Sequence, residues 1–156
     1  MKKIRWKILI ILFVIVFLVV AAGSLFTSSN TDTDWYNSIK PKITPPNYVF
    51  PIVWNILFAL ISISLYLSWI NSNKKQKNKI AIIFGINLAL NLIWSIIFFP
   101  LKNPSLAFAE LIFLWLSIIM MITAAYKINK LSSYLLIPYF LWVTFAGYLN
   151  YLIAFQ

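Results

Sequence analysis

The sequence predicts an all-α membrane protein, a five-transmembrane-helix bundle with a long structured loop between the first two helices. Of the 156 residues, 62% are hydrophobic and 10% are charged, so too few polar side chains exist to cover a soluble domain. Five apolar runs recur along the chain, each close to the roughly 20 residues that a bilayer-crossing helix needs. No internal repeat is evident, and five helices cannot form two equal inverted halves. We therefore expect one domain over residues 1–156, not the common plan of secondary transporters.

The apolar runs set the expected helix boundaries. They cover residues 8–26, 51–70, 80–99, 105–126 and 132–154. The short polar segments between the later runs predict tight turns at residues 71–79, 100–104 and 127–131. The first run also has the basic start and the small residues Ala21, Ala22 and Gly23 of a cleavable signal peptide. It is longer than a typical signal core, which favours a retained helix.

The first connection, residues 27–50, is long, and we call it the lid loop. It is rich in rigid aromatic and proline residues rather than the Gly and Ser of a flexible linker. Trp35 and Tyr36 offer large flat surfaces, and Pro45 and Pro46 hold the backbone extended. This composition predicts a structured cover over something aromatic or apolar.

The net charge of +10 is distributed unevenly between the two ends of the predicted bundle. One side holds the clusters Lys2, Lys3, Arg5 and Lys7; Lys74, Lys75, Lys77 and Lys79; and Lys127 and Lys130. The other side holds Lys40, Lys42 and Lys102 with Asp32 and Asp34. The positive-inside rule predicts a multi-pass protein of the cell membrane, with its N-terminus cytoplasmic and with the lid loop and the C-terminus outside. Basic clusters that flank apolar spans meet lipid headgroups, so nucleic acid is not an expected partner.

The residue types that are missing restrict the chemistry. There is no Cys and no His, which excludes disulfides, thiol nucleophiles, ordinary zinc sites and the commonest haem ligands, so no metal site and no obligatory cofactor are expected. Glu110 is the only acidic residue within a predicted helix, so paired-carboxylate catalysis is excluded there. Glu110 is either a functional carboxylate or a structural residue. A structural Glu110 would reach the membrane–water interface or form a hydrogen bond to another helix, and we favour this interpretation.

The third predicted helix has two different faces at about 100° per residue. One face is polar and aromatic and should point to the bundle interior; it carries Asn87, Asn91, Trp94, Ser95 and Phe98. The opposite face carries Gly85, Ala89, Ile93 and Ile96. The small pair Gly85 and Ala89 predicts a homodimer seam, although such pairs also pack within monomers. Interhelical hydrogen bonding is the alternative role of the polar face.

The fifth predicted helix has a similar stripe, which consists of Pro138, Trp142, Phe145, Ala146 and Leu149. A Trp beside a small Ala, facing the third helix, would shape a flat slot, and Trp54 with Phe58 would complete its wall. The best candidates for a ligand pocket are therefore Trp54, Trp94 and Trp142.

Several segments together resemble the translocator protein family, also called TspO, the tryptophan-rich sensory protein or the peripheral-type benzodiazepine receptor. They are Trp35-Tyr36, Lys40-Pro41, Pro45-Pro46, Phe50-Pro51, Val53-Trp54, the run from Leu88 to Ser95, and the runs Pro138 to Trp142 and Leu149-Asn150. The resemblance spans most of the chain in the right order. It implies a five-helix bundle with a pocket beneath the first loop, often assembled as a homodimer, and a bacterial-type member.

The same resemblance implies ligands and site residues. Family members bind tetrapyrroles such as protoporphyrin IX and haem, and animal members also bind cholesterol and synthetic ligands. By motif, the lid contributes Tyr36, Pro45 and Pro46, and the pocket is lined by Trp54, Asn91, Trp94, Ser95, Trp142 and Ala146. The cholesterol motif needs a basic residue after a Tyr near the C-terminal end. No basic residue follows Tyr151, which argues against cholesterol binding.

The leading functional hypothesis is a membrane receptor or sensor that binds porphyrin-type tetrapyrroles. Some bacterial members are associated with light-dependent breakdown of protoporphyrin IX, and that role would make Trp54, Trp94 and Trp142 the reactive candidates. The bound pigment would supply the chemistry. No conventional catalytic constellation is present, and enzymatic activity is left open. The alternatives are a transporter of porphyrins or other lipophilic metabolites, and a structural partner protein with no ligand of its own.

Overall fold

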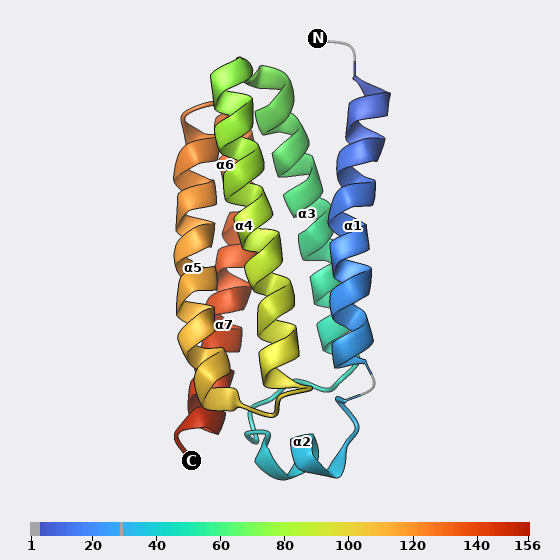
Figure 1. Cartoon of the computed structure of the whole chain (residues 1–156), viewed down its shortest axis with the longest axis vertical. Helices are drawn as coiled ribbons and strands as arrows, with labels where there is room; N and C mark the ends of the chain where they lie inside the picture. Colours follow the sequence, from blue (N-terminus) through green and yellow to red (C-terminus); the bar gives the residue numbers. More distant parts are fainter. Residues whose placement is uncertain (1–3, 29) are drawn as a thin grey trace.

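The computed structural model describes residues 4–28 and 30–156 and shows an elongated bundle of long helices (Figure 1). The helices are α1 (Trp6–Thr27), α2 (Asp34–Ile39), α3 (Val49–Asn71), α4 (Lys74–Phe98), α5 (Pro104–Tyr126), α6 (Lys130–Tyr134) and α7 (Ile137–Ala154). Within the described residues, five helical segments are long and apolar enough to cross a membrane, α6 and α7 together forming the fifth. The predicted fold class, an all-α five-helix membrane bundle, is confirmed.

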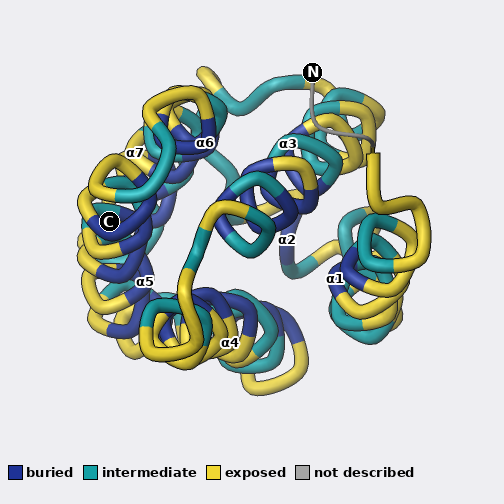
Figure 2. Tube along the Cα trace, turned by 90° about the horizontal axis from the view of Figure 1, so that it is seen from above, coloured by how far each residue is buried: buried dark blue, intermediate teal, exposed yellow. Residues whose placement is uncertain are grey.

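Burial in the bundle follows the helix faces (Figure 2). The central core is built from large apolar side chains such as Phe84 and Ile118, while residues on the outer faces, such as Ile82 and Phe113, are exposed. On α4 the predicted division of faces is present, because Asn87 is fully buried and Gly85 is exposed. Exposed apolar surface of this extent is expected where lipid, not water, surrounds the protein.

Two helix boundaries differ from the sequence prediction. Helix α4 begins at Lys74 rather than at residue 80, because Asn73 and Gln76 form a reciprocal capping box that starts the helix within the polar segment. The last predicted helix is divided into α6 and α7. Pro138 lies in the first turn of α7, where its missing N–H group costs no hydrogen bond.

A buried cluster of three serines fastens the short helix α6 to α3. Ser132 Oγ lies 2.9 Å from Ser64 Oγ and 2.7 Å from Ser68 Oγ, and it donates to the Ser64 carbonyl at 2.7 Å. All three residues are fully buried. Such hydroxyl bonds hold helices together in a bilayer, where no water competes for them.

The connections of the helices lie at two opposite ends of the bundle (Figure 1). The α3–α4 turn and the α5–α6 turn lie at the same end as the start of α1, and Lys77 and Lys130 stack over Trp69 and Tyr126 there at 5.6 and 5.7 Å. The lid loop, the α4–α5 turn and the C-terminus lie at the opposite end. The predicted basic residues Lys2 and Lys3 lie outside the described residues.

The lid loop folds around the short helix α2 and is anchored on the end of α4. Thr33 caps α2 by accepting a hydrogen bond from the Tyr36 backbone N–H. The ring of Trp35 contacts Phe98 edge-on, with 5.9 Å between centroids, and Lys102 stacks over Trp35 at 5.8 Å. The loop is therefore held in place by aromatic packing on the end of α4.

Candidate functional site

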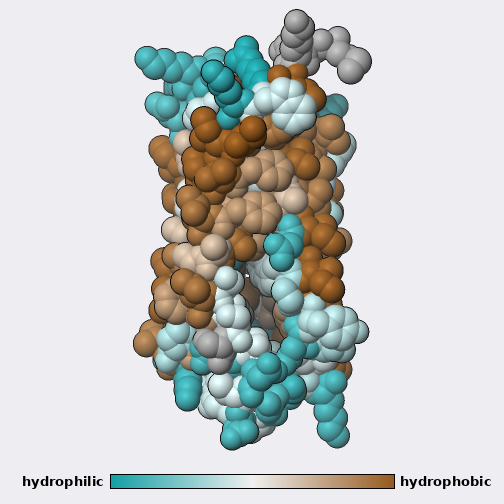
Figure 3. All heavy atoms as spheres, turned by 90° about the vertical axis from the view of Figure 1, so that its right-hand side faces the viewer, coloured by the Kyte–Doolittle hydropathy of each residue, from teal (hydrophilic) through white to brown (hydrophobic). Residues whose placement is uncertain are grey.

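A cavity of about 440 Å³ lies within the bundle at the lid-loop end. Its walls come from α1, α3, α4, α5 and α7, and the lid loop forms its roof. The side of the molecule formed by α1 and α3 shows an apolar belt and a hollow near the lid loop (Figure 3). The volume falls within the range of roughly 300–1,000 Å³ that is usual for small-molecule sites.

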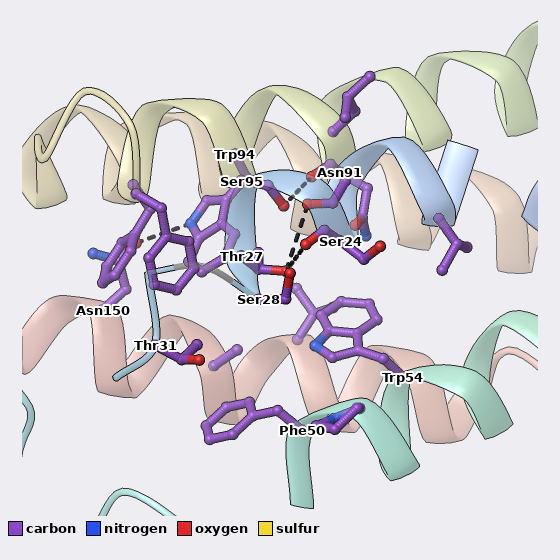
Figure 4. Close-up of a pocket in the computed structure, with 18 of the residues that line it drawn as sticks. Ser24, Thr27, Ser28, Thr31, Phe50, Trp54, Asn91, Trp94, Ser95 and Asn150 are labelled. Carbon is purple, nitrogen blue, oxygen red and sulfur yellow. Dashed lines mark hydrogen bonds between the residues drawn. The ribbon is translucent and has the colours of Figure 1, made fainter. Parts of the chain in front are cut away.

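Six of the nine predicted site residues line this cavity. They are Tyr36, Trp54, Asn91, Trp94, Ser95 and Ala146. Figure 4 shows Trp54 from α3 and Trp94 from α4 among the labelled residues, on different walls of the cavity. Trp54 stacks on Phe58 with 5.3 Å between ring centroids, and Trp94 stacks on Phe98 at 4.9 Å. The site therefore presents flat aromatic surfaces from two helices.

Trp142 lies elsewhere, and this differs from the prediction. It lines a separate groove between α3 and α7, together with Pro138, Leu141 and Phe145. The rotation of α7 explains the difference, because Tyr139 and Asn150 form hydrogen bonds that turn their own face of α7 inward. Val143 and Ala146 then line the cavity or its edge in place of Trp142. The Trp142 ring contacts the ring of Phe50 on the cavity wall, at 5.8 Å between centroids.

Pro45 and Pro46 also lie outside the cavity lining, whereas the next two residues, Asn47 and Tyr48, are part of it. Asn47 Nδ2 donates to the carboxylate of Asp32 at 2.6 Å and to the Thr31 carbonyl at 3.2 Å. These bonds join the two arms of the lid loop. The prolines set the path of the second arm, and Asn47 closes it against the first.

The sequence interpretation missed a polar wall at the end of α1. Ser24 and Thr27 line the cavity there. A Cβ added at Gly23 would lie 3.8 Å from both Leu92 Cδ1 and Ser95 Oγ, so α1 passes close to α4 at this point. The signal that would have identified this wall is the change from large apolar residues to Gly, Ser and Thr in the last turns of an otherwise apolar helix.

The donors of two cavity residues are engaged inside the protein. Trp94 Nε1 donates to Asn150 Oδ1 at 3.0 Å, and Asn150 Nδ2 donates to the Pro104 carbonyl at 2.8 Å.

In the roof, burial raises the pKa of the Tyr36 phenol. The Tyr36 hydroxyl therefore stays protonated and remains a hydrogen-bond donor.

Glu110 is buried on the inner face of α5, at 8% exposure. Neither of its carboxyl oxygens has a hydrogen-bond partner among the described residues. The favoured sequence interpretation required it to reach the interface or to bond across helices, and the structure shows neither. The reason is its place on the face that packs against α4 and α7.

Replacing Glu110 with Leu should raise the free energy of unfolding by about 1–3 kcal/mol, because a buried carboxyl without partners gives way to an apolar side chain of similar volume. Thermal unfolding in detergent micelles measures this, with Glu110→Gln as the uncharged polar control that should stay near the parent protein. A Leu variant that unfolds at lower temperature would show that the carboxyl stabilises the fold, and one that loses ligand affinity at unchanged stability would indicate a functional carboxylate.

The fold and the cavity together define a polytopic helical membrane protein with an aromatic internal cavity beneath an anchored loop. Comparison with known proteins agrees, since the model of the TspO/MBR family matches residues 10–156. The chain is 40% identical over 133 residues to the tryptophan-rich protein TspO of Archaeoglobus fulgidus, covering 85% of each chain. It is 31% identical over 121 residues to the human translocator protein, covering 75% of this chain and 71% of the relative. The chain belongs to the TspO/MBR family.

Proposed function

We propose that this protein is a membrane receptor or sensor that binds a porphyrin-type tetrapyrrole, such as protoporphyrin IX or haem, in the cavity beneath the lid loop. The observation that carries the proposal is the pair of Trp surfaces, Trp54 and Trp94, on walls formed by different helices. A flat apolar macrocycle gains from burial against such surfaces. A relative from Cereibacter sphaeroides is named tryptophan-rich sensory protein, which supports a sensory role.

The central experiment titrates the purified full chain, in detergent micelles and in darkness, with protoporphyrin IX. Saturable quenching of Trp fluorescence and a shift of pigment absorbance are expected. Quenching that rises linearly, as it does when the pigment only partitions into micelles, would rule out a specific site. Under light, pigment loss faster than in empty micelles would support breakdown of the bound pigment, and equal rates would remove that role while leaving binding intact.

The charges around the cavity predict how the acidic groups of a porphyrin are handled. Among the described residues that line the cavity, Asp32 is the only charged one. Carboxylates placed inside would be unpaired in a poorly solvated site, which is costly. We therefore expect the dimethyl ester of protoporphyrin IX to bind with a dissociation constant within about threefold of that of the free acid, or lower. An ester that binds much more weakly in the same titration would point to a basic partner such as Lys40 or Lys42.

Transport of porphyrins or other lipophilic metabolites is the second candidate function. The observation in its favour is the hollow near the lid loop on the side formed by α1 and α3, two helices whose residues line the cavity (Figure 3). Uptake of a fluorescent porphyrin into vesicles that contain the protein tests it. Uptake no faster than into protein-free vesicles would leave binding as the function.

We further propose the orientation and the assembly that the sequence predicts, with the lid loop and C-terminus outside the cell and the N-terminus cytoplasmic. The basic turns at one end of the bundle support this orientation, and protease access to the lid loop in intact cells tests it.

The exposed α4 face around Gly85 and Ala89 supports a homodimer, since a Cβ at Gly85 would meet no atom within 4 Å. A cross-link between Cys residues introduced on this face tests it.

A further inference from the structure

A chain of hydrogen bonds leads from the cavity wall to a residue of α5 that does not line the cavity. Asn91, which lines the cavity, donates from Nδ2 to Tyr139 Oη at 3.0 Å. Tyr139 Oη donates to Asn87 Oδ1 at 3.2 Å, and Asn87 Nδ2 donates to Ser117 Oγ at 2.8 Å. Tyr139 and Asn87 are fully buried, so water does not substitute for any link in this chain.

The direction of this chain is fixed at its far end. Amides and hydroxyls can in principle be ordered either way, because each both donates and accepts. Ser117 removes the ambiguity, because its single hydroxyl hydrogen is donated to the Leu114 carbonyl at 2.6 Å. Ser117 can then only accept from Asn87. Asn87 must in turn offer its Oδ1 to Tyr139, and Tyr139 must accept from Asn91.

The consequence for the cavity is that Asn91 has its carbonyl oxygen left over. No described residue donates a hydrogen bond to Asn91 Oδ1, and this oxygen is not among the fully buried atoms that lack partners. Since Asn91 lines the cavity, this oxygen is accessible to a ligand. Asn91 Oδ1 is therefore a hydrogen-bond acceptor whose orientation is set by Ser117, through Asn87 and Tyr139.

The neighbouring walls have the same polarity. The hydroxyl hydrogens of Ser24, Thr27 and Ser95 are donated to backbone carbonyls of their own helices, which leaves their oxygens as acceptors. The Trp94 N–H is donated to Asn150. No described residue accepts a hydrogen bond from Trp54 Nε1 or the Tyr36 hydroxyl, so donors remain available on α3 and in the roof. The α1 and α4 walls therefore mainly accept, and the available donors are Trp54 on α3 and Tyr36 in the roof.

We infer that the cavity selects ligands that present an N–H or O–H donor toward α4, and that Ser117 sets this preference by positioning the Asn91 amide through Asn87 and Tyr139. The inference rests on the proposed function, because it assumes a flat aromatic ligand in the cavity. Its consequence for the ligand class is a preference for flat aromatic ligands that carry an N–H or O–H group on their outer edge.

A matched pair of small fluorescent probes tests the inference without the size and charge of a porphyrin. Carbazole and N-methylcarbazole share one ring system and differ only in the N–H group. Each is titrated into the purified full chain in detergent micelles, with binding corrected for partition into empty micelles. We expect carbazole to bind about tenfold more tightly, the value of one hydrogen bond to an otherwise unpaired acceptor.

Three variants separate positioning from a general structural effect. In Ser117→Ala the Asn87 amide can rotate by a half-turn and exchange its oxygen and nitrogen, so Asn91 is no longer held in one orientation. The preference for carbazole should then fall to about threefold or less, while the affinity for N-methylcarbazole is retained. Ser62→Ala is the matched control, because Ser62 is also fully buried and its hydroxyl donates only to Phe58 of its own helix. The preference for carbazole over N-methylcarbazole should be unchanged in Ser62→Ala. Asn91→Leu should make the two probes bind equally.

The outcomes distinguish this inference from the proposed function. Equal binding of the two probes to the parent protein, or an unchanged preference in Ser117→Ala, overturns donor selection while the cavity remains a binding site. A loss of preference in Ser62→Ala as large as in Ser117→Ala overturns the positioning role. If neither probe binds saturably, the cavity does not accept flat aromatic ligands, and both proposals fall.

Discussion

Replacing Tyr139 with Ala should lower the free energy of unfolding by about 3–5 kcal/mol, the largest loss that we expect from a single side chain of this bundle. Tyr139 is among the largest fully buried side chains, and its ring contacts Trp54 edge-on with 6.2 Å between centroids. Its hydroxyl bonds to both Asn91 and Asn87. The substitution therefore opens a cavity, and it removes the hydrogen-bond partner of Asn87 Oδ1 and of Asn91 Nδ2.

The measurement is detergent-induced or thermal unfolding, followed by near-ultraviolet circular dichroism. Tyr139→Phe keeps the ring and removes only the hydroxyl, so its loss should be smaller, about 1–2 kcal/mol. Tyr148→Ala on the same helix is the matched control, because Tyr148 is 53% exposed and loses little packing. A Tyr139→Ala variant no less stable than Tyr148→Ala would show that the buried hydrogen bonds of Tyr139 do not hold α7 in place.

The fold could be predicted from the sequence because the length and spacing of the apolar runs reflect the thickness of the bilayer. Local polar signals would have refined the boundaries. The Asn73 to Gln76 spacing is a capping-box pattern, and it places the start of α4 within a segment that composition alone assigns to a turn. A structured lid loop was likewise expected from Trp35 and Tyr36, whereas its helix α2 and its packing on Phe98 were not.

The site could be predicted only where a single helix determines it. On α4 the polar and aromatic face follows from helical periodicity, so Asn91, Trp94 and Ser95 lie together as expected. On α7 the choice between Trp142 and its neighbour Val143 depends on hydrogen bonds to residues more than forty positions away, such as Tyr139 to Asn87. Helical periodicity gives the spacing of a stripe along one helix, but not the rotation of that helix within the bundle.

Replacing Trp54 and Trp142 one at a time tests whether the ligand binds in the cavity or in the groove between α3 and α7. Trp54 lines the cavity, and no described residue forms a hydrogen bond with its indole nitrogen, so its replacement removes a ligand surface without leaving a hydrogen-bond partner unpaired. Trp142 lines the separate groove between α3 and α7. Trp54→Leu should weaken binding of protoporphyrin IX by about 2 kcal/mol, roughly 30-fold in the dissociation constant, because buried Trp contacts dominate recognition.

Trp142→Leu should leave the dissociation constant within about threefold of the parent value, since Trp142 contacts Phe50 on the cavity wall but does not itself line the cavity. Pigment absorbance is the better measure for both variants, because the Trp fluorescence itself changes when a Trp is replaced. The melting temperature of each variant shows whether the fold is intact. If Trp142→Leu weakens binding as much as Trp54→Leu at equal stability, the ligand extends between α3 and α7 into the groove, and the site is wider than the cavity.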